Sequence, residues 1–373
     1  MSNIVTVAQK LPAKLQLPAD IKTMPEEISN YENWDLTRMP NLNLRLENTA
    51  WGNFNNAQMQ RLNMAGCDLR CAEFTGANLE GANLSGSDLR GAKLQGANLT
   101  GINLHGADLS HADLRDALLS RATLVSAVLQ GANLENATLE SANLYHANLG
   151  ATIPEDLDLT GETTLSWTLV LPGGANLLNA NLKGVNLSGA NLSFAQLGFA
   201  DLSGATLTGA VGIGASFFRT NLSRIQAGEL ILTRATLTRA NLAGAYLREA
   251  ILRQCEMSRC NLSGRVDLYE ANLVEATMVG ADLTGVSLTF ANLTRTDLNR
   301  AQMAGAELFE ATLCGTILDG ADLREANLWT DISQVDLSGV ELRQGVKIKP
   351  QAVDAATRPV PPPPVGLRRR WVD

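Results

Sequence analysis

The chain has 373 residues, of which 45% are apolar but only 5% aromatic, because Leu and Ala supply most of the apolar share. A core built from two residue types indicates a repeated cross-section instead of two or three separate globular cores. The sequence has no apolar run of bilayer-spanning length and no basic-then-apolar secretory signal, so the predicted location is the cytoplasm. Secretion without a classical signal is the alternative.

The net charge of −8 is distributed unevenly along the chain. Residues 1–40 carry −1, residues 41–150 carry −3, residues 151–174 carry −4, residues 175–345 carry −4, and residues 346–373 carry +4. The two long segments are only mildly acidic for their length, whereas the densest acidity lies in the short segment 151–174. These five segments are also the predicted divisions of the chain.

Residues 1–40 contain four prolines and no regular repeat, which predicts a mostly extended N-terminal lead-in. We expect this segment to cap the first repeat, with Trp34, Leu36 and Trp51 close to that repeat. A docking arm for another protein is the alternative interpretation of the same residues.

A large apolar residue recurs at every fifth position from Phe54 to Leu149, in twenty pentads without a slip, and a small residue, usually Ala, stands two positions before most of these centres. An α-helix turns by about 100° per residue, so a period of five forms no buried stripe on a helix. In a continuous strand the side chains alternate between the two faces, so residues five apart would point to opposite faces. The period therefore predicts a solenoid in which each pentad contributes a short extended piece and a bend, often at Gly. It leaves the number of sides open.

The first array, residues 41–150, loses its phase at Pro154, and regular spacing resumes at Leu177. The interval 151–174 is predicted to be a loop that projects from the rod, and a distorted coil that bends the rod is the alternative. The second array, residues 175–345, has weak centres at Gly212 and Ala227 and takes one extra residue near Arg265.

The recurrent motif Ala-(Asp/Asn)-Leu-x-x is similar to that of the pentapeptide-repeat family over about three quarters of the chain. Examples are Ala107-Asp108-Leu109, Ala132-Asn133-Leu134, Ala190-Asn191-Leu192 and Ala281-Asp282-Leu283. The resemblance implies an all-β fold, a right-handed quadrilateral parallel β-helix with about thirteen coils in two arrays spaced like ordinary strands. In this register Leu192 is expected to be interior and Ser193 exterior.

Residues 346–373 differ in composition from the arrays. Pro359 to Pro364 indicate a polyproline II segment, and Arg368, Arg369, Arg370 and Trp371 follow it. Because this composition cannot build a core, it predicts a disordered basic tail, and a recognition peptide for a proline-binding domain is the alternative.

The sequence predicts no catalytic residue, no cofactor and no metal site. Cys67, Cys255 and Cys260 occupy positions that usually hold Ala, so we interpret them as free thiols that fill the core. The three histidines fall on exterior positions of different coil steps. Without a phosphate-binding loop or a nucleophile elbow, the protein is not expected to be an enzyme.

Charged residues twenty apart are expected to stack on one side of the rod. Four arginines are predicted to form such a ladder: Arg219, Arg239, Arg259 and Arg300. Four glutamates are predicted to line the opposite side: Glu229, Glu249, Glu270 and Glu310. In the first array Asp68, Asp88 and Asp108 also stack. Stacked like charges repel, so the arginine ladder favours an acidic partner or a packing face, and plain solubility is the alternative.

Three functions are compatible with these features. The first is a scaffold that binds another protein, with Glu155, Asp156, Asp158, Glu162 and Trp167 of the interval as further candidate contacts. The second, permitted by the family resemblance, is a DNA mimic that modulates or protects DNA gyrase or topoisomerase; the arginine ladder and basic tail count against it. The third is a bacterial secretion-associated accessory or effector protein.

No membrane contact is predicted, and a homodimer through a rod end is a further alternative. Direct nucleic-acid binding is not expected, because the total charge is acidic and exposed aromatic residues should be few.

Overall fold

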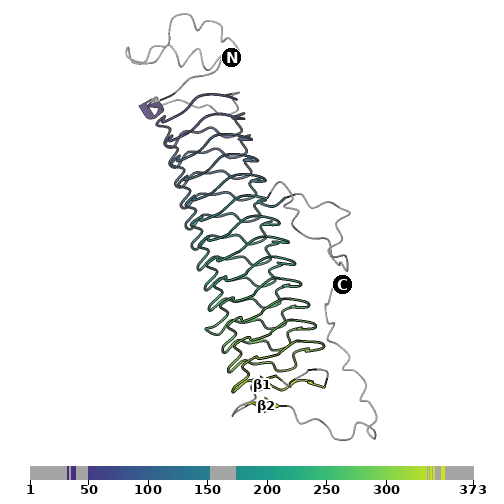
Figure 1. Ribbon diagram of the computed structural model, residues 1–373. Coiled ribbons are helices and arrows are strands. Elements are labelled where there is room, and N and C mark those ends of the chain that lie inside the picture. The colour runs from purple at the N-terminus through teal and green to yellow at the C-terminus, as the bar shows by residue number, and fades with distance from the viewer. Residues whose placement is uncertain are drawn as a thin grey trace, which may run out of the picture.

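The computed structural model describes residues 32, 35–38, 49–151, 174–333, 335, 337, 339–340 and 346–348. These residues form one long rod of stacked coils (Figure 1). The named elements are short: a 3-10 helix, η1, at Leu36–Arg38, and two strands, β1 at Asn327–Leu328 and β2 at Lys347–Ile348, which pair in parallel. The remaining pairing in the described part of the chain consists of single-residue parallel bridges.

The bridges form four ladders, so the rod has four faces. The ladders run through Asn53, Gln58, Asn63 and Asp68 and advance by 20 residues per coil. Each of these residues precedes a pentad centre by one position, so one pentad forms one face and four pentads complete a coil. We number the faces 1 to 4 in this order, and corner 1 is the corner that follows face 1. The two residues after each centre form the corner and are called its leading and trailing residues.

Each corner is a β-turn between two short extended pieces. The carbonyl oxygen of Leu69 accepts a hydrogen bond from the N–H of Ala72 at 3.1 Å, and the trailing residue of this turn, Cys71, has a φ of 56°. Positive φ at the third residue of a turn is what Gly accepts at no steric cost. The coils are held together beside the corners, where the N–H of Leu79 donates to the carbonyl of Asn98 in the next coil at 2.8 Å.

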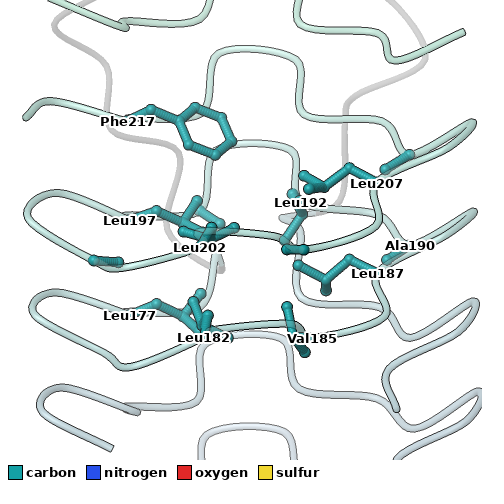
Figure 2. Close-up of a cluster of buried hydrophobic side chains, with 14 of the residues drawn as sticks. Leu177, Leu182, Val185, Leu187, Ala190, Leu192, Leu197, Leu202, Leu207 and Phe217 are labelled. Atoms are coloured by element: carbon teal, nitrogen blue, oxygen red, sulfur yellow. The ribbon is translucent and has the colours of Figure 1, made fainter. Parts of the chain in front are cut away.

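The interior contains the pentad centres and the small residues that precede them (Figure 2). Leu192 and Ala190 are both fully buried, as the period predicts. Phe54 and Phe74 stack in neighbouring coils with ring centroids 4.8 Å apart, which is the ordinary spacing of hydrogen-bonded strands. The interior register predicted from the sequence is therefore confirmed.

The three cysteines predicted for the core are buried there. The Sγ atoms of Cys255 and Cys260 each lie 2.7 Å from a carbonyl oxygen of the preceding coil, those of Leu232 and Leu237. Burial raises the pKa of both thiols to about 12. These thiols therefore stay protonated and donate to the carbonyls, which removes them as nucleophiles or metal ligands.

The two weak centres are compensated by neighbouring side chains. At Ala227 the adjacent small-residue positions hold Ile225 and Leu230, and both are buried. At Gly212 the space is taken by Leu232 of the next coil, because a Cβ at position 212 would lie 2.7 Å from its Cδ2. The core volume is thus kept although the motif is broken.

The two predicted arrays form one continuous stack. Asn133 pairs with Asn176 and Asn148 with Asn191, so the ladders step by 43 residues across the interval and by 20 on either side. The N–H of Ala175 donates to the carbonyl of Leu149 at 2.7 Å, so the chain leaves and re-enters the rod within one coil. The projecting loop stays a prediction, which the unbroken ladders support over a distorted coil. Residues 152–173, which include Glu155, Asp156, Asp158, Glu162 and Trp167, lie outside the described residues.

The extra residue near Arg265 is confirmed by the pairing. Tyr246 pairs with Asp267, so the ladder of face 3 steps by 21 residues here. Gly264 and Arg265 have φ values of 79° and 64° and absorb the insertion in a longer turn at corner 2. The stack continues in register beyond it.

The N-terminal end of the core is covered by η1. Leu36 is buried, and its N–H donates to the carbonyl of Gln58 at 2.9 Å, which places it at the first coil as predicted. Asp35 extends the ladder of face 2 by pairing with Gln58. Trp51 also lies at the first coil as predicted, since its N–H donates to the carbonyl of Arg70 at 2.8 Å, but its side chain is 66% exposed and does not cover the core. Trp34 lies outside the described residues.

The expectation that Ser193 is exterior was wrong, because this side chain is fully buried. The carbonyl of Ser193 accepts a hydrogen bond from the N–H of Ala151 at 2.9 Å, and the neighbouring Phe194 is also buried. The chain leaves the rod at Ala151, directly over this corner, and covers a position that is open in other coils. The Ser193 hydroxyl has no hydrogen-bond partner among the described residues.

Candidate protein-interaction surfaces

The exposed side chains lie mainly at the corners, so a partner that binds along the rod would contact the corners. At corner 1 the trailing residue is Arg in four coils: Arg219, Arg239, Arg259 and Arg300, with φ values of 55°, 61°, 58° and 56°. Corner 2 of the same coils lies five positions further along the chain. After Arg239, Arg259 and Arg300, its trailing residue is glycine: Gly244, Gly264 and Gly305. The same backbone conformation is therefore filled by Arg at one corner and by Gly at the next.

The four predicted arginines lie together, and we call them the arginine ladder. The N–H of Arg219 donates to the carbonyl of Thr238 at 3.1 Å, and the N–H of Arg239 donates to that of Ser258 at 3.0 Å. Each trailing residue thus lies beside the corner of the next coil, so Arg219, Arg239 and Arg259 occupy consecutive coils. Gly280 interrupts the ladder before Arg300. All four arginines are exposed.

Four glutamates form a second ladder at corner 3. They are exposed trailing residues with φ between 52° and 58°: Glu229, Glu249, Glu270 and Glu310. Corners 1 and 3 are diagonally opposite in a four-sided rod. The second array is therefore bipolar in its geometry, as the twenty-residue spacing predicts.

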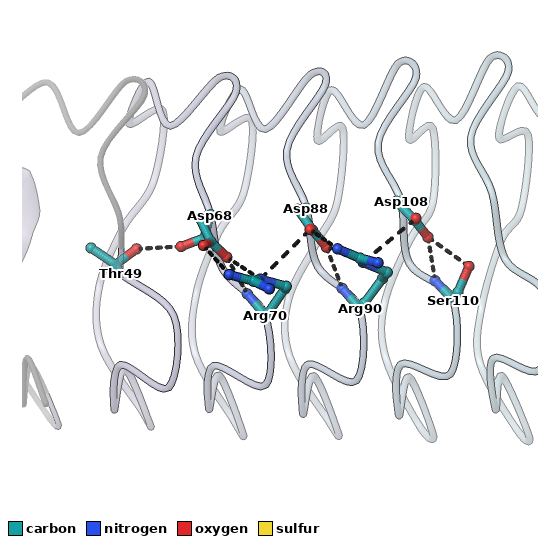
Figure 3. A network of polar contacts seen from close by, with 7 residues as sticks. All are labelled: Thr49, Asp68, Arg70, Asp88, Arg90, Asp108 and Ser110. Carbon is teal, nitrogen blue, oxygen red and sulfur yellow. Dashed lines mark hydrogen bonds and ion pairs between the residues drawn. The ribbon is translucent and has the colours of Figure 1, made fainter.

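Arginines at leading corner positions are paired within the rod (Figure 3). Arg70 Nη2 lies 2.7 Å from Asp68 Oδ2, and Arg90 Nη2 lies 2.6 Å from Asp88 Oδ2. Their Nε atoms also lie 3.7 Å from Asp88 and 3.8 Å from Asp108 in the next coil. The hydrogen bond with Arg90 holds the pKa of Asp88 below its usual range. Two of the three stacked aspartates of the first array, Asp68 and Asp88, are thus each paired with an arginine, which the Asp-Leu-Arg tripeptides could have signalled.

The arginine ladder is not neutralised in this way. Within the described ranges, no ion pair closer than 4.0 Å includes Arg239, Arg259 or Arg300. Arg219 lies over two aromatic rings, with its Cζ 5.8 Å from the centroid of Phe199 and 5.4 Å from that of Phe218. Corner 1 therefore presents cationic and aromatic groups together.

Exposed aromatic residues gather at corner 3, which the sequence reasoning missed. In four consecutive coils this corner holds Tyr269, Phe290, Phe309 and Trp329, which we call the aromatic strip. Phe290, Phe309 and Trp329 are 40%, 38% and 40% exposed. Their spacing of nineteen to twenty-one residues is a signal only once the length of a coil is known.

The described residues contain no group of three or more His, Cys, Asp or Glu side chains arranged to hold a metal ion. No helix in the described part of the chain is long and apolar enough to cross a membrane.

The sequence matches the family model for pentapeptide repeats in eight copies. The matched residues are 53–86, 82–121, 117–153, 173–198, 195–226, 231–264, 265–300 and 300–344. No curated protein matches the sequence.

Solved structures of pentapeptide-repeat proteins resemble the chain. HetL, involved in heterocyst differentiation regulation in the cyanobacterium Nostoc sp. strain PCC 7120, is 30% identical over 71% of this chain and 90% of its own, with a TM-score of 0.22. Rfr23 from the cyanobacterium Cyanothece 51142 is 28% identical over 39% of this chain and 91% of its own, with a TM-score of 0.15. QnrB1, a plasmid-mediated fluoroquinolone resistance protein, is 16% identical over 71% of this chain and 89% of its own, with a TM-score of 0.24.

The family match and the four parallel ladders agree on the same architecture. The rod is a right-handed quadrilateral β-helix, as the motif implied. The matched segments span most of the sequence between residues 53 and 344, so the chain belongs to the pentapeptide-repeat family.

Proposed function

We propose that this protein is a non-enzymatic scaffold that binds another protein through the arginine ladder. The observation that carries the proposal is the contrast between two corners of the same coils: Arg239 is followed by Gly244, and Arg259 by Gly264. A residue other than Gly at positive φ costs roughly 1 kcal/mol, and stacked like charges repel. Other corners of the second array also carry trailing arginines, such as Arg224 and Arg234, but corner 1 carries them in three consecutive coils and again two coils later. Because solubility would be served at any corner, this regular repetition favours a contact role.

The chemistry of corner 1 indicates an acidic protein partner. Guanidinium groups bind carboxylates with two parallel hydrogen bonds. Phe199 and Phe218 lie beside Arg219 and add apolar area, and arginine and aromatic residues are enriched among the residues that contribute most to protein interfaces. We therefore expect a complementary surface that carries Asp or Glu in a row along the rod axis.

We propose that the protein acts in the bacterial cytoplasm. Cys71, Cys255 and Cys260 are free thiols, and free thiols persist in a reducing compartment. A secretion-associated role would use the same corner and is a narrower form of the same proposal. A homodimer through a rod end would use the C-terminal end, since η1 covers the N-terminal end.

A DNA mimic directed at gyrase is the second candidate, and the charge pattern supports it less well. Such a mimic needs continuous negative faces that replace phosphates. The aspartate row of the first array is interrupted by Arg70 and Arg90, each bound to its own aspartate. The scaffold therefore fits the described surface better than the duplex mimic.

The double variant Arg239→Gly/Arg259→Gly is expected to lose binding while keeping or gaining stability. Gly relieves the positive-φ cost at both positions, which is partly offset by its larger freedom in the unfolded chain. The partner would be captured from a bacterial lysate on immobilised full-length protein and identified by mass spectrometry. Its affinity for the variant, measured by calorimetry, should fall about tenfold or more, while thermal melting stays level or rises.

The matched control is Glu229→Gly/Glu249→Gly, which makes the same backbone change at corner 3. This variant should bind the captured partner like the parent. Equal affinity of the parent and both variants would contradict a contact role for the arginines. Inhibition of gyrase supercoiling that survives Arg239→Gly/Arg259→Gly would instead support the DNA-mimic candidate.

A further inference from the structure

The aromatic strip at corner 3 is a partly exposed surface, and its first three rings are in contact with one another. The ring centroids of Tyr269 and Phe290 are 5.5 Å apart with an interplanar angle of 81°, and those of Phe290 and Phe309 are 5.8 Å apart at 90°. Trp329 follows in the next coil, where its carbonyl accepts a hydrogen bond from the N–H of Glu310 at 3.0 Å. Three coil steps at ordinary strand spacing make the strip about 14 Å long. Because Phe290, Phe309 and Trp329 are each about two-fifths exposed, the strip leaves apolar surface open to a ligand.

Carboxylates of the glutamate ladder border the strip. Glu249, Glu270 and Glu310 are exposed trailing residues at the same corner. The one cation in contact with a ring of the strip, among the described residues, is Arg248, whose Cζ lies 4.1 Å from the Tyr269 centroid. Its Nε lies 3.5 Å from Asp267 Oδ2, so its charge is balanced within the rod. The strip therefore favours an apolar ligand that carries positive charge.

The chain beyond the rod starts beside this strip. Lys347 of β2 pairs with Asn327 of β1 and so extends the ladder of face 3 by one coil. Ile348, the next residue, pairs with Leu328, is 40% exposed, and so lies one coil beyond Leu328, directly before the corner that carries the strip. Residues 349–373 lie outside the described residues and begin where the aromatic strip ends.

We propose that the aromatic strip binds this chain's own segment 349–373, with the prolines on the rings and the arginines on the glutamates. Pro359 to Pro364 would measure about 19 Å as polyproline II, close to the length of the strip. Aromatic surfaces recognise such segments because they are already extended and lose little entropy on binding. Ten residues lie between Ile348 and Pro359, and the eleven Cα–Cα steps reach at most about 36 Å, so the prolines can lie over any ring of the strip.

The arginines of the segment complete the match. Arg368, Arg369 and Arg370 follow the prolines, so they would lie near Glu249 and Glu270 when the prolines cover the rings. Opposite charges at an exposed site contribute little each, but they set the direction in which the segment lies. Docking would cover corner 3 and leave the arginine ladder on the diagonal corner open, so the two proposals can fail independently.

Limited trypsin digestion of the full chain tests this docking, because trypsin cuts after Arg368, Arg369 and Arg370. The rate of release of the C-terminal fragments, followed by intact mass spectrometry, should be about tenfold slower in the parent than in Phe309→Ser/Trp329→Ser, because cleavage follows the population of the undocked segment. Replacing all four residues Pro361 to Pro364 with Ser should speed cleavage similarly without touching the rod. Added salt should raise the parent's rate toward that of the variants.

Phe199→Ser is the matched control, since Phe199 is an exposed aromatic residue at corner 1 and 50% exposed. It should leave the cleavage rate at Arg368 to Arg370 unchanged. Equal rates in the parent, the strip variant and the proline variant would overturn the proposal. Protection that disappears on dilution would also overturn it, because it would show that the segment binds a second copy and not its own rod.

Discussion

Replacing Leu222 with Asp is expected to lower the free energy of unfolding by several kcal/mol and to break the rod near its middle. Leu222 is 1% exposed and lies in a core cluster built from Leu, Ala and other apolar side chains. A carboxylate there has no partner, so it loses its hydration without compensation. Because each coil of a solenoid is stabilised by its neighbours, the damage should extend beyond one pentad. Urea denaturation followed by circular dichroism measures the effect.

Arg224→Asp is the matched control for this prediction. Arg224 is exposed and lies two residues after Leu222, at the trailing position of corner 2 with a φ of 58°. Asp is among the residues that tolerate positive φ, and exposed substitutions usually change stability by less than about 0.5 kcal/mol. Similar denaturation midpoints for the two variants would show that the interior register assigned here is incorrect.

Replacing Gly174 with Ala is expected to cost about 1–3 kcal/mol of stability at the point where the chain re-enters the rod. A Cβ at position 174 would overlap the carbonyl oxygen of Phe194, and it would lie 2.6 Å from that carbonyl carbon and 2.9 Å from the backbone nitrogen of Ala195. These are backbone atoms of the next coil, so no rotamer change can relieve the contact. Hydrogen exchange should show faster exchange in the coil that contains Phe194 and Ala195.

Gly204→Ala separates this steric effect from the cost of positive φ. Gly204 has a φ of 68°, but a Cβ there would have no atom within 4 Å. Its replacement should cost only the conformational penalty, roughly 1 kcal/mol. If Gly174→Ala melts at the temperature of the parent, residue 174 does not pack closely against the backbone of Phe194 and Ala195.

Several features of the rod could be predicted from residues alone. A period of five with a large residue at the centre places Leu192 inside, because no helix or single strand can bury that pattern on one side. The extra residue near Arg265 was visible as a break in phase, and Tyr246 indeed pairs with Asp267. The twenty-residue spacing of the arginine ladder predicted one corner, and the four arginines share it.

Other features depend on contacts between coils and were not visible in the period. Four sides were expected from the family motif, since the period itself leaves that number open, and the four bridge ladders show them. The pairing of Asp68 and Asp88 with arginines depends on which way Arg70 and Arg90 turn, which the hydrogen bonds decide. The burial of Ser193 depends on the chain leaving the rod at the neighbouring Ala151.

The sequence by itself determined which side chains face the core, because burial follows from a local period that every pentad repeats. Only the tertiary structure decided which exposed side chains meet. Phe290 and Phe309 are nineteen residues apart in the chain, yet their ring centroids are 5.8 Å apart, because parallel pairing of successive coils brings them together. The number of residues per coil therefore determines which exposed side chains lie together on the rod, and the hydrogen bonds between neighbouring coils define that number.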